Sequence, residues 1–284
     1  MQVSSAWSNR LGTPFENQKG YSGLAQLSGY TASYREWGEG PPLILIPGLA
    51  GGIDLVTPLA QQLARSFRVI AYQLRGEEDS FALRRRFGLK ELVQDLHEFM
   101  EWHGLERPDV LGLSFGGVVG LDFASRYSHR LNSLTVQGVG ARFDSKLVKT
   151  ITGMVLMGYP LPTDSAFINQ FFQLLFGRGP QPKERMEFVT RQCWQTDQSV
   201  IAHRFRLVRK LDLRPRLSQI RTPVMIISAA RDVVVSDRSV LDLCAGIEEA
   251  KFVRLPHGGH LAFLVDPERI CREVSTFAYG CCVA

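Results

Sequence analysis

One stretch of this chain decides its fold: DVLGLSFGGVVGLDFASRY, residues 109–127. Its first five residues predict a short buried strand, and residues 115–127 predict a helix entered through glycines. Between them stands Ser114, inside the pattern Gly-x-Ser-x-Gly. In a strand-to-helix turn this pattern places a serine on a sharp, strained bend. Glycine at 112 and 116 removes side chains that would otherwise collide there.

The same turn predicts a place for negative charge. Ser114 comes at the amino end of the following helix, whose free N–H groups and dipole favour an anion. The Phe115 N–H group is the natural donor to an oxyanion that forms at this serine. The alternative is a chance surface turn, but the flanking strand and helix favour Ser114 as a nucleophile.

Strands and helices are predicted to alternate on both sides of this turn. A short early strand covers residues 31–37, and buried aliphatic strands follow at 43–46, 68–73, 109–113, 134–139, 223–228 and 251–255. Helices are predicted at 59–64, 89–103 and 115–127. Strands separated by helical lengths need parallel crossovers, so the predicted architecture is a doubly wound, mostly parallel α/β sheet.

Residues 141–211 interrupt the alternation. They are rich in Phe, Leu, Met and Gln, contain three prolines and hold no convincing strand. We expect them to form an inserted helical cap over one end of the sheet. The remaining residues, 1–140 and 212–284, would then form one core domain.

With this turn and alternation, the chain from Thr31 to Phe277 resembles the α/β-hydrolase superfamily, in particular its serine carboxylesterase-like members with a helical cap. In that superfamily the catalytic residues follow the order Ser, acid, His. A serine hydroxyl is a weak nucleophile, so it needs a base, and the base needs an acid that holds its tautomer.

The resemblance implies one residue for each of these two roles. Asp232 follows the strand at 223–228 just past its carboxyl end, where the superfamily carries its acid. His260 follows the last strand in a Gly-His pair similar to the one that carries the base. His257 is the competing histidine, and the Gly-His match favours His260.

The loop after the strand at 43–46 departs from the superfamily. It reads Pro47-Gly48-Leu49 where His-Gly-x is common, which leaves the path of the loop open. By correspondence, the Leu49 N–H group is the second oxyanion donor beside that of Phe115. A backbone donor works with any side chain.

Residues 72–76 resemble the superfamily's D-x-R-G segment, with Gln73 in place of the Asp. We interpret this segment as structural. The acidic residues Glu77, Glu78 and Asp79 that follow could be structural too or could border the entrance of a binding pocket.

Bulk properties exclude several other classes of protein. The 284 residues are 45% hydrophobic and 21% charged, as in ordinary globular proteins. A formal charge of +5, scattered along the chain, does not indicate a nucleic-acid surface. No His, Cys or carboxylate pairs fall at metal-ligand spacing, and we expect neither a metal nor another cofactor.

The cellular location is predicted from the lack of three sequence features: a disulfide framework, a secretory signal and a membrane span. Five unevenly spaced cysteines do not suggest disulfides, and residues 1–19 lack the apolar core of a secretory signal. No segment approaches the length of a membrane span. We therefore expect a cytoplasmic protein. Residues 281–284 formally fit a prenylation box, but no polybasic segment precedes them, so we interpret them as a frayed tail.

The function expected from these residues is hydrolysis of a small-molecule carboxylic ester through an acyl-enzyme on Ser114. The same fold also supports a carbon–carbon bond hydrolase, an amidase, a cofactor-free haloperoxidase or a non-catalytic receptor for a small ligand. The first of these commonly has an aromatic residue after the base, where this chain has Leu261. Met154, Met157, Phe171 and Phe172 are candidates to line an apolar substrate site, although such a stripe is more often packing core than pocket. The oligomeric state stays open.

Overall fold

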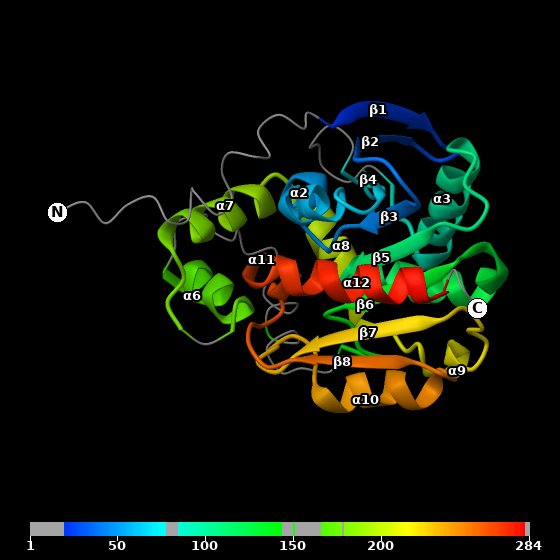
Figure 1. Ribbon diagram of the computed structural model, residues 1–284. Coiled ribbons are helices and arrows are strands. Elements are labelled where there is room, and N and C mark those ends of the chain that lie inside the picture. The colour runs from blue at the N-terminus through cyan, green and yellow to red at the C-terminus, as the bar shows by residue number, and fades with distance from the viewer. Residues whose placement is uncertain (1–19, 78–84, 144–149, 151–165, 178, 282–284) are drawn as a thin grey trace.

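Short aliphatic runs pair into a sheet with helices on both faces (Figure 1). The computed structural model describes residues 20–77, 85–143, 150, 166–177 and 179–281. Within these residues the strands are β1 (Tyr21–Gln26), β2 (Thr31–Trp37), β3 (Pro42–Ile46), β4 (Arg68–Tyr72), β5 (Asp109–Leu113), β6 (Ser133–Gln137), β7 (Val224–Ala229) and β8 (Lys251–Leu255).

Helices fill most of the connections between these strands. They are α2 (Gly52–Leu63), α3 (Leu89–Trp102), α4 (Phe115–Tyr127), the short 3₁₀ helix η2 (Ser128–Arg130), α6 (Ala166–Leu175), α7 (Lys183–Cys193), α8 (Gln198–Arg209), α9 (Arg214–Leu217), α10 (Asp237–Gly246), α11 (Ala262–Val265) and α12 (Pro267–Cys281).

The strands lie in the order β1-β2-β4-β3-β5-β6-β7-β8. From β4 to β8 every neighbouring pair is parallel, whereas β2 is antiparallel to both of its neighbours, β1 and β4. The register sets Ile46 opposite Gly112 and Leu113 opposite Gln137. The carboxyl ends of β3, β5 and β6 therefore meet at one edge, which confirms the predicted mostly parallel α/β fold.

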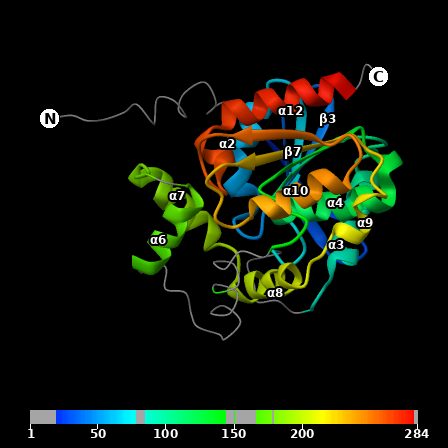
Figure 2. The same ribbon diagram turned by 90° about the horizontal axis from the view of Figure 1, so that it is seen from below.

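Side chains alternate between the two faces of the sheet, as the twofold period of a strand requires. In β3, Leu43 and Leu45 join a buried cluster with residues of α2, α11 and α12, whereas Ile44 and Ile46 join one with residues of α3, α4 and α10. Figure 2 shows these helices as two layers on opposite sides of the strands. Burial on both faces explains why the strands are continuous aliphatic runs.

Several elements differ from the sequence predictions, among them β1, α2 and β6. Strand β1 was not predicted, because Tyr21–Gln26 is an edge strand with a mostly exposed burial pattern. Helix α2 begins at Gly52 rather than at residue 59, although it contains Pro58, because packing buries one side of the whole helix. Strand β6 ends at Gln137, and Gly138 already turns with a positive φ of 68°.

Between β6 and β7 the described residues form helices α6 to α9. Helices α6 and α7 stand at one end of the layered core (Figures 1 and 2), and α8 lies on the side of the sheet that carries α3, α4 and α10 (Figure 2). The backbone N–H of Leu261, in the loop after β8, donates to the Leu175 carbonyl at the end of α6 at 2.9 Å. The end of α6 thus lies near the carboxyl end of β8.

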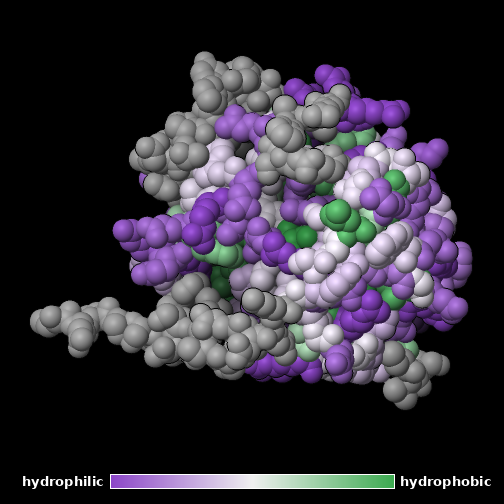
Figure 3. Space-filling view, turned by 90° about the horizontal axis from the view of Figure 1, so that it is seen from above, coloured by the Kyte–Doolittle hydropathy of each residue, from purple (hydrophilic) through white to green (hydrophobic). Residues whose placement is uncertain are grey.

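Few large apolar side chains are exposed among the described residues. Tyr21 of the edge strand β1 is the most exposed, at 66%, followed by Leu24 of the same strand and Leu241 of α10, both at 61%. On the face seen in Figure 3, hydrophobic residues lie in small patches between hydrophilic ones. None of the helices in the described ranges combines the length and apolar character that crossing a membrane needs.

Candidate active site

The turn between β5 and α4 holds Ser114 in a strained conformation. Its φ of 50° and ψ of −114° lie outside the regions that L-residues prefer. Among the non-glycine residues that the structure describes, only Glu249 also has a positive φ. Such strain persists only where surrounding contacts fix it, and it gathers at functional sites.

Glycines on both sides of Ser114 make the turn possible. A methyl group on Gly112 would stand 2.5 Å from the Gly117 Cα and 2.7 Å from the Gly116 carbonyl oxygen. A methyl group on Gly116 would collide with the carbonyl groups of Ile46 and Pro47 on the neighbouring chain segment. The elbow therefore packs against the end of β3 as well as on itself.

Three side chains from the carboxyl edge of the sheet form a chain of hydrogen bonds. His260 Nε2 lies 2.7 Å from Ser114 Oγ, and His260 Nδ1 lies 2.9 Å from Asp232 Oδ2. With its proton on Nδ1, where the carboxylate accepts it, the imidazole presents the Nε2 lone pair to the serine hydroxyl. In this tautomer His260 can take the proton of Ser114.

The surroundings of Asp232 keep its carboxyl group ionised. Burial raises its pKa, but the charge and hydrogen bond of His260 and the N–H groups of Val234 and Val235 outweigh it and lower the pKa. Those two N–H groups donate to Oδ1 at 2.8 and 3.1 Å, which leaves Oδ2 for the imidazole. The loop after β7 therefore both orients the Asp232 carboxylate and favours its ionised form.

The two histidines of the last loop lie in different surroundings. His260 is buried, with 9% of its surface exposed, and reaches Ser114. His257 is exposed. Its position gives it no part in the hydrogen-bonded chain.

Two residues that the sequence analysis did not single out hold this arrangement together. Gln137, at the end of β6, accepts the Ser114 N–H at 2.8 Å with its carbonyl and donates from Nε2 to the His260 carbonyl at 3.1 Å. A methyl group on the next residue, Gly138, would come within 3.2 Å of the His260 imidazole. A buried Gln-Gly pair at the end of a predicted parallel strand was the available signal for both.

One predicted oxyanion donor follows Ser114 directly in the chain, and the other lies in the loop after β3. Phe115 is the first residue of α4, where helix N–H groups have no intrahelical acceptor. Leu49 follows Gly48, whose Cα lies so near the elbow that an added methyl would stand 3.7 Å from Ser114 Cβ. The loop from residue 47 to 51 thus passes beside the serine despite the proline that replaces the usual histidine.

Side chains distant in sequence hold this loop. Thr196, between α7 and α8, accepts the Gly51 N–H at 2.9 Å, and Arg204 of α8 donates to the Leu49 carbonyl at 2.8 Å. The start of α2 is held as well, because Gln73 Oε1 accepts from the Ile53 N–H at 3.0 Å. Nothing in the sequence pattern indicated Thr196 or Arg204.

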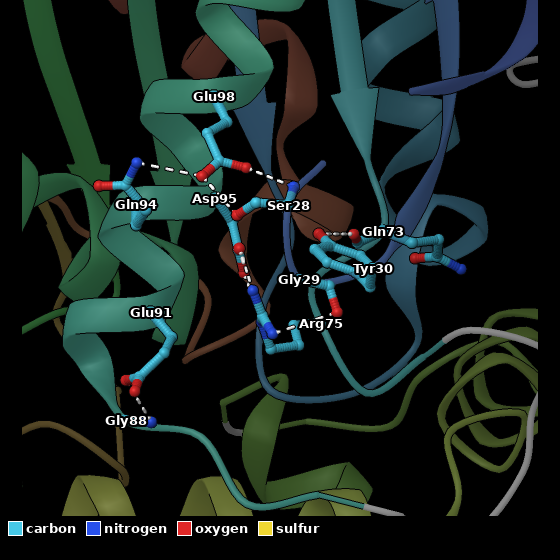
Figure 4. A network of polar contacts seen from close by, with 10 residues as sticks. All are labelled: Ser28, Gly29, Tyr30, Gln73, Arg75, Gly88, Glu91, Gln94, Asp95 and Glu98. Atoms are coloured by element: carbon cyan, nitrogen blue, oxygen red, sulfur yellow. Dashed lines mark hydrogen bonds and ion pairs between the residues drawn. The ribbon is translucent and has the colours of Figure 1, made fainter. Parts of the chain in front are cut away.

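The segment after β4 otherwise serves packing. Figure 4 shows Arg75 bound to helix α3, where its Nε and Nη2 donate to the Asp95 carboxylate at 2.9 and 2.5 Å. Tyr30 Oη donates to the Gln73 carbonyl in the same group of contacts. These contacts lie on the α3 side of the sheet and support a structural reading of the segment.

The acidic residues that follow are only partly described. Glu77 forms an ion pair with Arg204, and their side chains are 4% and 0% exposed. Because Glu77 is buried, it does not border a solvent-filled entrance. Glu78 and Asp79 lie outside the described residues.

The predicted substrate-lining residues have mixed outcomes. Phe172, 7% exposed, belongs to the buried cluster of α2, α11 and α12, and the half-buried Phe171 packs against it. Met154 and Met157 lie outside the described residues. Substrate contact by any of the four stays a prediction.

No group of three or more metal-binding side chains occurs within the described ranges. The arrangement has the chemistry of a hydroxyl nucleophile with a hydrogen-bonded base, an ionised acid and two candidate backbone donors for an oxyanion.

Comparison with known proteins places this geometry in context. A family model described as alpha/beta hydrolase fold matches residues 41–267. A protein named "Putative carbamate hydrolase RutD" from Cronobacter turicensis is 26% identical over 243 residues, which cover 81% of this chain and 87% of that protein.

Solved structures share the fold. A hydrolase from Pseudomonas aeruginosa is 25% identical, with a TM-score of 0.78, and the match covers 91% of this chain and 98% of that one. An esterase from Exiguobacterium antarcticum has a TM-score of 0.81 at 17% identity and covers 91% of this chain and 100% of that one, a likeness of fold alone.

Proposed function

This chain belongs to the alpha/beta hydrolase fold family, and from that premise we propose that it is a serine hydrolase that cleaves carboxylic esters through an acyl-enzyme on Ser114. The matching proteins support a hydrolase of this fold without specifying the bond that it cleaves. One observation carries the proposal further: the unbroken hydrogen-bonded series from Ser114 Oγ through His260 to the Asp232 carboxylate.

In the proposed first half-reaction, Ser114 Oγ attacks the ester carbonyl carbon while His260 Nε2 takes the hydroxyl proton. The carbonyl oxygen becomes an oxyanion, for which the N–H groups of Phe115 and Leu49 are the proposed donors. Asp232 stabilises the imidazolium that forms. His260 then gives its proton to the leaving alkoxide, and the carbon–oxygen bond breaks to leave an acyl group on Ser114.

In the second half-reaction, a water molecule replaces the alcohol. His260 takes a proton from the water, whose oxygen attacks the acyl carbonyl, and returns a proton to Ser114 Oγ as the acid leaves. No redox step or bound cofactor enters this sequence.

We propose residues 141–211 as the cap of this site. Two contacts support the assignment: the end of α6 meets the loop of the base at Leu261, and α8 meets the loop of Leu49. A cap in this position would exclude water from the oxyanion and offer an apolar surface to the acyl group.

The test is reaction of the parent protein with a fluorophosphonate probe and with nitrophenyl esters from acetate to decanoate. We expect rapid labelling of Ser114 and a rate that rises over the first carbons and then falls. A protein that neither labels nor hydrolyses any ester would be a receptor built on this fold.

A carbamate series belongs in the same experiment because the relative from Cronobacter turicensis bears the name of a carbamate hydrolase. If the matched nitrophenyl carbamate is turned over faster than the ester of equal length, the ester assignment is wrong while the acyl-enzyme mechanism stands.

A further inference from the structure

Arg204, on helix α8 of the proposed cap, is the largest fully buried side chain among the described residues. All four terminal N–H groups of its guanidinium have acceptors. Nη1 donates to the Leu49 carbonyl at 2.8 Å and to the Glu77 carboxylate, and Nη2 donates to the carbonyls of Leu74 and Arg75 at 3.3 and 3.1 Å. A buried cation with this many partners is a built site rather than a chance contact.

The Leu49 contact bears on the reaction because it fixes the peptide unit directly after the Leu49 N–H group. Two residues further on, Gly51 has a φ of 86° and Gly52 a φ of 46°, a region that favours glycine. A loop that ends in two such glycines has little stiffness of its own. Its place beside Ser114 therefore depends on outside anchors.

Arg204 also contacts the other proposed donor residue. Its guanidinium carbon lies 5.8 Å from the centre of the Phe115 ring, and Phe115 is 1% exposed. One side chain thus contacts both residues whose N–H groups are assigned to the oxyanion. Thr196 anchors the same loop at Gly51 from the same inserted segment.

We propose that Arg204 is a positioning residue that sets the Leu49 N–H group at the distance from Phe115 that an oxyanion needs, with Glu77 holding Arg204 and Thr196 assisting. The inference rests on the proposed function, because it assigns a role within the same site. It makes the inserted segment part of the catalytic geometry rather than only a cover.

The chemistry of the side chain makes the idea testable. A lysine keeps the charge beside Glu77 but has three donors on one nitrogen, so it cannot span Glu77 and three backbone carbonyls in a fork. Removing Arg204 alone leaves Glu77 as a buried unpaired charge, which destabilises the fold, whereas replacing both members of a buried ion pair by apolar side chains of similar volume is often neutral. Two variants therefore separate position from stability: Arg204→Lys and the double change Arg204→Met with Glu77→Met.

The experiment measures kcat and KM on a nitrophenyl ester that the parent cleaves, together with the thermal midpoint of each variant. It adds the affinity for a trifluoromethyl ketone, to which Ser114 adds to form an oxyanion, relative to the matched methyl ketone. Thr196→Val tests the second anchor. Arg221→Lys is the control, since Arg221 pairs with Glu248 in an exposed ion pair.

We expect both Arg204 variants to stay folded and to lose on the order of 10²-fold in kcat with little change in KM, since misplacement by about 1 Å has effects of this size. The preference for the trifluoromethyl ketone should fall by a similar factor, and Thr196→Val should lose less. Arg221→Lys should match the parent.

Two results would overturn the inference, and they are distinguishable. A parent that cleaves the ester, with folded Arg204 variants that keep its kcat and its trifluoromethyl ketone preference, would show that Arg204 serves stability alone. A parent that reacts with neither ester nor ketone would remove the proposed function and this role with it.

Discussion

The two halves of the proposed oxyanion hole are built in opposite ways. Phe115 is placed by consecutive residues, because strand, strained serine and helix follow one another from 109 to 127. Leu49 is placed by partners far away in sequence: Gly51 meets Thr196 across 145 residues, and Leu49 meets Arg204 across 155. A local motif and a set of long-range contacts therefore meet at Ser114, and different substitutions should disrupt each of them.

The largest expected effect comes from the elbow itself. Ser114→Ala should lower esterase activity by about 10⁶-fold while the thermal midpoint stays near that of the parent, because the triad acts as a unit and the change adds no atoms. Steady-state hydrolysis and thermal unfolding measure the two. Activity within about tenfold of the parent would show that Ser114 is not the nucleophile.

Asp232→Asn should lower kcat by about 10⁴-fold, since an amide presented to Nδ1 favours the wrong imidazole tautomer. The control His257→Ala should have parental activity. A folded Asp232→Asn variant with near-parental kcat would show that Asp232 has no part in catalysis.

The same variant has a predicted pH signature. Asp232 has a lowered pKa in the folded protein, so its contribution to stability is present above the ordinary aspartate range and is lost as pH falls through the lowered value. The difference in unfolding free energy between parent and Asp232→Asn should therefore shrink on acidification. Denaturant titrations at a series of acidic pH values measure it, and a constant difference would contradict the assignment.

A pair of glycine substitutions compares how tightly the elbow of Phe115 and the loop of Leu49 are packed. Gly116→Ala drives a methyl into two backbone carbonyls and should cost about 1–3 kcal/mol of unfolding free energy. Gly48→Ala, with its nearest neighbour at 3.6 Å, should stay within about 0.5 kcal/mol. Denaturant unfolding measures both. Equal losses of unfolding free energy would mean that the loop of Leu49 is packed as tightly as the elbow.

The smallest effect is expected at Phe171 of helix α6. If Phe171 lines the acyl site, Phe171→Ala should change the ratio of kcat/KM for neighbouring acyl lengths by up to about fourfold per methylene, the value of about 0.8 kcal/mol for each buried CH₂. An unchanged chain-length profile would make Phe171 packing alone, in keeping with its place against the buried cluster.

Most of the sheet could be predicted from sequence, because strands buried on both faces are continuous aliphatic runs. Edge strand β1 escaped because its mostly exposed residues have no such run. The start of α2 escaped because Gly52 and Pro58 disfavour a helix locally, and only burial of Ile53, Leu55 and Val56 against the sheet offsets that preference.

By itself, the sequence determined the alternating architecture and the elbow at Ser114, since period and glycine placement are short-range patterns, and its resemblance to the α/β-hydrolase superfamily supplied the candidates Asp232 and His260. The tertiary structure alone decided how the loop of Leu49 is held. Arg204 lies in ordinary helical sequence and Thr196 in the turn before that helix, and their role arises from hydrogen bonds to backbone groups about 150 residues away, which no local pattern encodes.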